Sequence, residues 1–188
     1  MKKIIPAVAF VGLLLCGCAS GNPFTSTKPD FDKAYSVDAQ IKFDGNEAKA
    51  EVVRNSSGDW QFCFSEPEAL NGIQLNLTPE GMSAALGELN VSAEKSSVYT
   101  MIPDIIAHSL DSLPEVKSES ITENEGVLTI ETELDSRRVT VTADSSGQLI
   151  SLKCPYHKLS VYFSNQESTK APTKVETKES DEGSIALE

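Results

Sequence analysis

The sequence is poor in the side chains that most enzymes and nucleic-acid-binding proteins depend on. Its 188 residues include two histidines, four cysteines and one tryptophan, and 16 lysines and arginines stand against 28 aspartates and glutamates. The net charge of −12 repels nucleic acid and anionic lipid headgroups. This balance argues against nucleic-acid binding and against electrostatic docking on a membrane.

Motifs that carry chemistry are also missing. There is no glycine-rich phosphate loop, no G-x-S-x-G elbow and no cysteine pair at zinc spacing. Asp104 and His108 stand four residues apart, the spacing of a metal or acid–base pair on a helix, but a solvated helix face is the favoured interpretation. Cys154 precedes His157 closely, yet a nucleophilic thiol must be accessible and activated. We therefore predict no catalytic residues, no metal and no cofactor.

Only one long hydrophobic run is present, and it lies at the start of the chain. Two lysines precede an apolar stretch over residues 4–16, which is short for a transmembrane helix and typical of an export signal. The run ends in Leu15-Cys16-Gly17-Cys18, which resembles a bacterial lipobox. That resemblance implies cleavage before Cys18, acylation of its thiol and a lipid anchor in the membrane. The alternative is an ordinary secretory signal that leaves a soluble protein.

A lipid anchor would hold the protein at the extracytoplasmic face of the cell membrane. If the source has an outer membrane, Ala19 after the lipidated cysteine resembles the default for sorting to that membrane. The acyl chains would then be the attachment, because the acidic chain does not bind anionic headgroups.

Composition divides the chain into four segments. Residues 1–17 are the expected signal peptide, and residues 18–32 form a flexible tether rich in serine, threonine, glycine and proline. Residues 33–164 carry nearly all the apolar pattern and are the expected folded domain. Residues 165–188 are polar and charged, and we expect a disordered acidic tail there.

Two cysteines remain once the signal is removed and Cys18 is acylated. Cys63 and Cys154 can form a disulfide in an oxidising compartment. The alternative is two separate buried thiols that behave as small apolar side chains.

Within the domain, apolar and polar residues alternate with a period of two, which predicts half-buried strands joined by short turns. The expected strands are residues 35–43, 48–52, 60–64, 73–77, 128–134, 139–143, 150–154 and 159–163. Residues 82–91 fit no element clearly. From Thr100 to Leu113 the apolar spacing becomes helical, and Pro114 ends the helix. The fold class is therefore α+β, mainly an antiparallel sheet whose apolar face is covered by one helix.

Three stretches resemble the half-barrel superfamily of bacterial lipoprotein carriers and lipid-binding lipoproteins of the LolA, LppX and RseB type. They are the long hairpin over residues 34–54, the aromatic strand Trp60–Ser65 running on to Gly72, and the mid-chain helix followed by a closing meander from Asp144. The resemblance implies a curved antiparallel sheet, a half-barrel, around an apolar cavity for acyl chains.

Six apolar residues are the candidates for such a cavity. An aromatic stripe on one strand would face three isoleucines of the helix; the set is Trp60, Phe62, Phe64, Ile102, Ile105 and Ile106. Such a stripe is more often ordinary core, which is the favoured alternative for these residues. The first expectation is a non-catalytic, membrane-anchored module that binds a lipid or a lipidated partner. The second is a cell-envelope interaction domain with a filled core.

Overall fold

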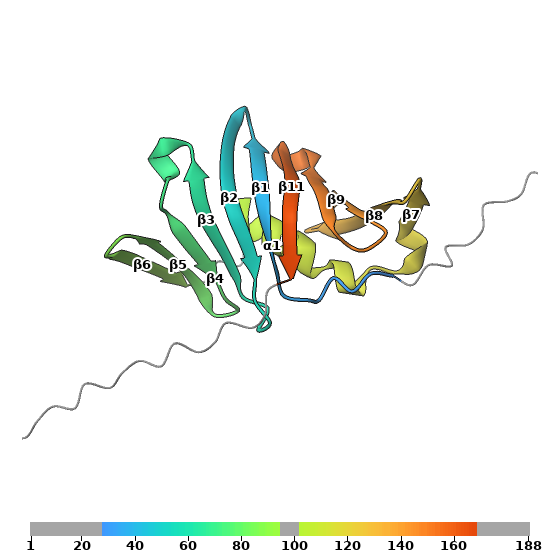
Figure 1. The fold of residues 1–188 in the computed structure, drawn as a ribbon, viewed down its shortest axis with the longest axis horizontal. Helices are drawn as coiled ribbons and strands as arrows, with labels where there is room; N and C mark the ends of the chain where they lie inside the picture. The colour runs from blue at the N-terminus through green and yellow to red at the C-terminus, as the bar shows by residue number, and fades with distance from the viewer. Residues whose placement is uncertain (1–27, 95–101, 169–188) are drawn as a thin grey trace, which may run out of the picture.

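The computed structural model describes residues 28–94 and 102–168, which form one antiparallel sheet of eleven strands and, within those ranges, a single α-helix (Figure 1). This confirms the α+β class and the curved, half-barrel-like sheet. The elements are β1 (Tyr35–Phe43), β2 (Asn46–Arg54), β3 (Trp60–Glu66), β4 (Gln74–Leu77), β5 (Gly81–Leu86), β6 (Leu89–Glu94), α1 (Ile102–Asp111), β7 (Ile121–Asn124), β8 (Val127–Leu134), β9 (Arg137–Asp144), β10 (Leu149–Cys154) and β11 (Leu159–Ser168). Short 3₁₀ turns cover Glu68–Leu70, Leu113–Glu115, Ser118–Ser120 and Pro155–His157.

The chain enters the sheet at its centre. The strand order is β6-β5-β4-β3-β2-β1-β11-β10-β9-β8-β7, so the chain builds outward from β1 to one edge, crosses to the other edge and returns to β11. The crossing between β6 and β7 contains α1, which lies across one face of the sheet (Figure 1). The first and last strands pair with each other and join the two meanders into one sheet.

Tight turns with left-handed backbone set the hairpins. Asp44 and Gly45 have φ of 44° and 84° between β1 and β2, and Asp135 and Ser136 have φ of 50° and 60° between β8 and β9. Two-residue turns of this kind match the right-handed twist of the strands that they join. The short turn expected after residues 35–43 is thereby confirmed, and β1 and β2 pair without a register shift.

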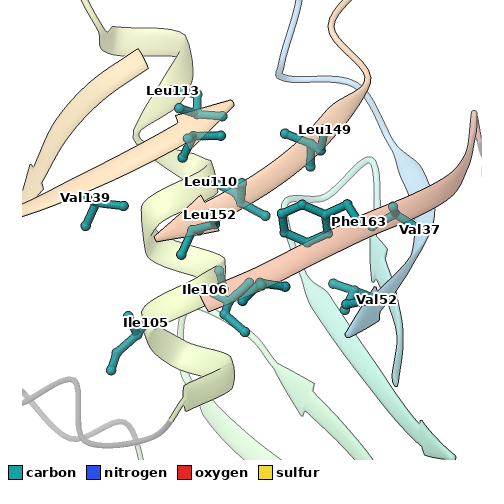
Figure 2. Close-up of a cluster of buried hydrophobic side chains, with 14 of the residues drawn as sticks. Val37, Val52, Ile105, Ile106, Leu110, Leu113, Val139, Leu149, Leu152 and Phe163 are labelled. Carbon is teal, nitrogen blue, oxygen red and sulfur yellow. The ribbon is translucent and has the colours of Figure 1, made fainter. Parts of the chain in front are cut away.

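The helix packs its apolar face on the inner face of the sheet. Ile105, Ile106 and Leu110 are almost fully buried, and Figure 2 shows Ile106 and Leu110 directed toward Leu152 and Phe163 of the sheet. The predicted cover of the apolar sheet face by this helix is confirmed. Thr100, where the helical spacing begins, lies outside the described residues.

Two elements differ from the sequence-based expectation. The unassigned residues 82–91 form most of the β5–β6 hairpin, which turns at Gly87 with φ of 59°. The short strand β7 was not predicted, because four residues are too few to show a period. The sheet is therefore wider at both edges than the apolar alternation indicated.

The segment before β1 packs against the domain. Phe31, which the composition placed in the tether, belongs to the core. The Lys28 Nζ donates hydrogen bonds of 2.7 Å to the carbonyl oxygens of both Pro114 and Val116. We call residues 28–32 the N-terminal strap. At the other end of the domain, β11 continues to Ser168.

Several expectations fall outside the described residues, among them the signal peptide, the lipidated Cys18 and most of the acidic tail. No helix in residues 28–94 or 102–168 is long and apolar enough to cross a membrane.

Candidate functional site

Four of the six predicted cavity residues are packed core. Trp60 and Phe62 are 3% and 0% exposed, and Ile105 and Ile106 are 1% and 0% exposed. Side chains this deeply buried fill space rather than line an open cavity. The other two, Phe64 and Ile102, are only half-buried and lie at the border of the core. All six residues therefore belong to one apolar cluster or pack against it, and Phe64 is part of its accessible border.

A polar network joins α1 to the sheet at Trp60, toward the other end of β3 from Phe64. The Asp111 carboxylate, at the end of α1, accepts a 3.0 Å hydrogen bond from Arg54 Nε and a 2.9 Å hydrogen bond from Trp60 Nε1. Arg54 also binds Asp32 of the N-terminal strap, at 2.7 Å. Burial opposes the charge of Arg54, but the hydrogen bonds to Asp111 and Asp32 outweigh it and raise the pKa of the guanidinium. The strap, the helix and two strands therefore meet at one buried charge.

Cys63 and Cys154 are both free, so the predicted disulfide is not formed. They lie on β3 and β10, which are four strand spacings apart, or about 19 Å along the sheet, whereas a disulfide needs Cα atoms within about 7 Å. Cys63 also faces the outer side, between the inward residues Phe62 and Phe64, while Cys154 is buried in the core. The alternative of a separate buried thiol describes Cys154, whereas Cys63 is only partly buried and lies on the outer face.

The weak catalytic candidates have structural roles. His108 Nε2 lies 3.3 Å from Asp104 Oδ1 along α1, and no group of three potential metal ligands gathers anywhere in the described residues. Cys154 is fully buried, which removes it as an accessible nucleophile. Burial and the Arg137 charge lower the pKa of His157, whose Nε2 lies 3.1 Å from Arg137 Nη1. A neutral His157 accepts that hydrogen bond.

The accessible apolar surface lies beyond the helix, on strands β3–β6, which we call the wing (Figure 1). Cross-strand register places its apolar residues in rows on the inner face. One row runs from Phe62 through Leu75 and Ala84 to Val91, and a second from Trp60 through Leu77 to Met82. Leu86 lies opposite Leu89 at the hairpin end.

Exposure rises along these rows from the core to the edge. Phe62 is 0% exposed and Leu75 9%, whereas Val91 at the end of the same row is 68% exposed. Leu86 and Leu89 are 47% and 72% exposed. Isolated exposed apolar side chains are ordinary, but a contiguous set that continues the core indicates a binding surface.

The outer face of the wing is polar. Gln61 donates to Asn76 at 3.0 Å, and Asn76 donates to Ser83 at 3.4 Å, so a ladder of polar side chains crosses three strands. Ser92 continues the row on β6. The wing is therefore a two-sided sheet, with solvated residues on one face and apolar residues on the other.

A separate hollow of about 800 Å³ lies on the outer face of the central strands. The carboxylates of Asp38 and Glu51 lie opposite each other there, beside Gln40 and Lys49. Burial and the nearby Glu51 charge raise the pKa of Cys63 at its rim, so that thiol is a poor nucleophile. The hollow also borders Phe64 and Tyr162, so its lining combines charged and apolar residues.

Comparison with known proteins gives structural similarity alone. No family model matches the chain, and no curated protein matches it. Solved structures that match include an uncharacterized conserved protein from Thermus thermophilus, with 9% identity over 73% of this chain and 80% of that one and a TM-score of 0.48. A LolA superfamily protein from Nitrosomonas europaea has 7% identity over 77% and 90% of the two chains and a TM-score of 0.41. LprF from Mycobacterium bovis has 12% identity over 75% and 89% and a TM-score of 0.38. At these identities and scores, no ligand or activity carries over to this chain.

Sequence reasoning missed the outermost residues of the surface. Met82, Ala84 and Leu86 alternate with Ser83 and Ala85, which is a strand signal, but the small alanines and the absence of β-branched and aromatic residues made it faint. The predicted aromatic stripe marks where this surface begins, and the hairpin after it carries its exposed part.

Proposed function

We propose that this chain is a membrane-anchored bacterial lipoprotein whose domain binds an acyl chain, of a lipid or of a lipidated partner, on the inner face of the wing. The observation that carries the proposal is the continuous apolar surface that leads from buried Phe62 to exposed Val91 and Leu89. The role is binding, without a chemical step.

The chemistry of the surface favours a flexible hydrocarbon. Its exposed end consists of aliphatic side chains, Leu86, Leu89 and Val91, and its interior of the small Ala84 beside Met82. These residues offer contact without a charged group to orient a polar ligand. Each methylene removed from water contributes about 0.8 kcal/mol, so a long acyl chain gains affinity from length alone.

The anchor is tested at Cys18. If the thiol carries the lipid, wild-type protein should fractionate with membranes, and Cys18→Ser should lose the acyl mass and remain uncleaved. Cys16→Ser is the matched control and should leave membrane attachment unchanged. Equal acyl mass on wild type and Cys18→Ser, or none on either, would contradict the anchor without touching the ligand proposal; fractionation alone does not decide, because uncleaved Cys18→Ser keeps the apolar residues 4–16.

The ligand site is tested by titrating residues 19–188 with a fluorescent fatty acid. Ala84→Asp places a charge on the inner face, and Ala85→Asp places the same charge on the outer face of the same strand. We expect Ala84→Asp to weaken binding by about tenfold or more, which is about 1.4 kcal/mol, and Ala85→Asp to leave it unchanged. Equal affinities for the two variants would overturn the proposed site.

A second candidate is an interaction domain with a filled core. It is favoured by the complete burial of Phe62, Ile105 and Ile106, which leaves no room for a ligand between helix and sheet. In that case fatty acid should not bind the wild type at all, and the apolar wing would serve a protein partner.

A further inference from the structure

Strand β6 is the last strand on the wing side of the sheet. Within the described ranges no strand pairs with its outer edge. Its other edge pairs with β5 without a register shift, from Leu86 opposite Leu89 to Gly81 opposite Glu94. Such an edge presents backbone N–H and C=O groups that can pair with a further strand.

The two edges of the sheet differ in their protection. Natural edge strands avoid association by being short, by carrying charges or proline, or by bulging. At the other edge, β7 has four residues and carries Glu123, with Glu125 directly after it. By contrast, β6 has six residues, no lysine, no proline and no bulge, and its single charge is the terminal Glu94. The wing edge is therefore longer than the opposite edge, and its charges, Glu88 and Glu94, lie outside the uncharged stretch over residues 89–93.

We propose that two copies of this chain pair through β6 in antiparallel orientation, about a two-fold axis at Asn90. A two-fold axis perpendicular to the sheet keeps the inner faces of both copies on one side. The interface is then isologous, since each copy contributes the same strand. The proposal stands independently of the acyl ligand.

In this register, the β6 side chains of one copy complement those of the other copy. Leu89 of each copy lies opposite Val91 of the other, so aliphatic side chains meet twice on the inner face. On the outer face Asn90 lies opposite its own copy, and two amide side chains can each donate and accept one hydrogen bond. Ser92 lies opposite Glu88, so no like charges face each other. A register shifted by one residue would set Val91 against polar side chains.

Charge determines where two copies can meet. The net charge of −12 opposes association in general, but residues 89–92 carry no charge. Charges farther away are screened beyond about 8 Å at physiological ionic strength. Two copies can therefore meet at β6 more readily than at the acidic β7 edge. Pairing would also extend the inner faces of the two wings into one apolar surface.

Disulfide trapping in isolated membranes tests the pairing on the full chain. Residues directly opposite in an antiparallel pair have Cβ atoms about 4.5–5.5 Å apart, close to the range of a disulfide. Asn90→Cys, in a Cys63→Ser background, places a thiol at the axis. Glu123→Cys in the same background is the matched control, because it lies on the opposite edge and is exposed. A third variant adds Val91→Lys to Asn90→Cys, and Val91 is exposed enough to be changed without unfolding the domain.

We expect Asn90→Cys to give a disulfide-linked dimer on a non-reducing gel, Glu123→Cys to stay monomeric, and Val91→Lys to abolish the dimer. Asn90→Cys that stays monomeric, or that cross-links no more than Glu123→Cys, would overturn the proposal and leave the edge to a strand of another protein. A dimer that survives Val91→Lys would overturn it as well.

Discussion

Asp111 connects three parts of the molecule through one carboxylate. It accepts from Arg54 and Trp60, and Arg54 reaches on to Asp32 of the strap. Because Arg54 is 7% exposed, removal of its main partner leaves a charge that water cannot fully solvate.

Asp111→Ala should therefore destabilise the domain by about 2 kcal/mol, below the cost of breaking a fully buried pair because Asp111 is partly exposed. Chemical denaturation of residues 19–188 measures the change. Glu119→Ala is the control: its pair with Lys117 is 3.9 Å long and exposed, so we expect a change within about 0.5 kcal/mol. Similar losses for both variants would show that the Asp111 network contributes no more than a surface ion pair.

Gly147 tests whether the N-terminal strap is part of the fold. Its φ is +89°, and a Cβ there would lie 2.7 Å from Pro29 Cβ. Gly58 has a similar φ of +84°, with nothing within 4 Å of the added Cβ. Gly58→Ala should cost about 1–2 kcal/mol for backbone strain alone.

Gly147→Ala should cost about 1 kcal/mol more than Gly58→Ala, because it must also displace the strap. The comparison of the two unfolding free energies isolates that contact. If Gly147→Ala lowers the unfolding free energy no more than Gly58→Ala does, the strap moves aside without cost and does not contribute to stability.

At the scale of elements, α1 and the strands it covers form a filled layer. Ile106 is 0% exposed within that layer, whereas Ile102 at the start of the helix is half-buried. Ile106→Trp should destabilise by overpacking, by about 1–3 kcal/mol, and Ile102→Trp by less. Thermal unfolding gives the comparison. An Ile106→Trp domain as stable as the wild type would reveal space beneath the helix and return the ligand to that place.

The predictability of each element follows its pattern. Strict alternation and the Asp44-Gly45 turn made the β1–β2 hairpin predictable from the sequence, and helical spacing made α1 predictable. The β5–β6 hairpin could not be predicted from the sequence, because Ala84 and Ala85 suit either face of a sheet equally well.

The candidate site was predicted only in part. Alternation in β3 placed Trp60, Phe62 and Phe64 on one face correctly, but it cannot show which of them the helix buries. The disulfide failed for a related reason: the separation of Cys63 and Cys154 depends on the order of β2, β1 and β11 between them, which no local pattern contains.

On the scale of the whole molecule, the sheet has two unlike halves. The half from β8 to β2 is closed by α1 and the strap (Figure 1). The wing begins at β3, where Trp60 still contacts α1, and continues the same apolar face with rising exposure toward β6. The filled half contains most of the buried core, and the wing carries the proposed binding surface.

Native mass spectrometry of residues 19–188, purified from a bacterial host and then extracted for lipid, tests the central claim most directly. Removal of Cys18 keeps the anchor lipid out of the count. We predict about one acyl lipid per chain for the wild type and for Ala85→Asp, and none for Ala84→Asp. A bare mass for all three proteins, or equal lipid on Ala84→Asp and Ala85→Asp, would contradict acyl binding at the wing.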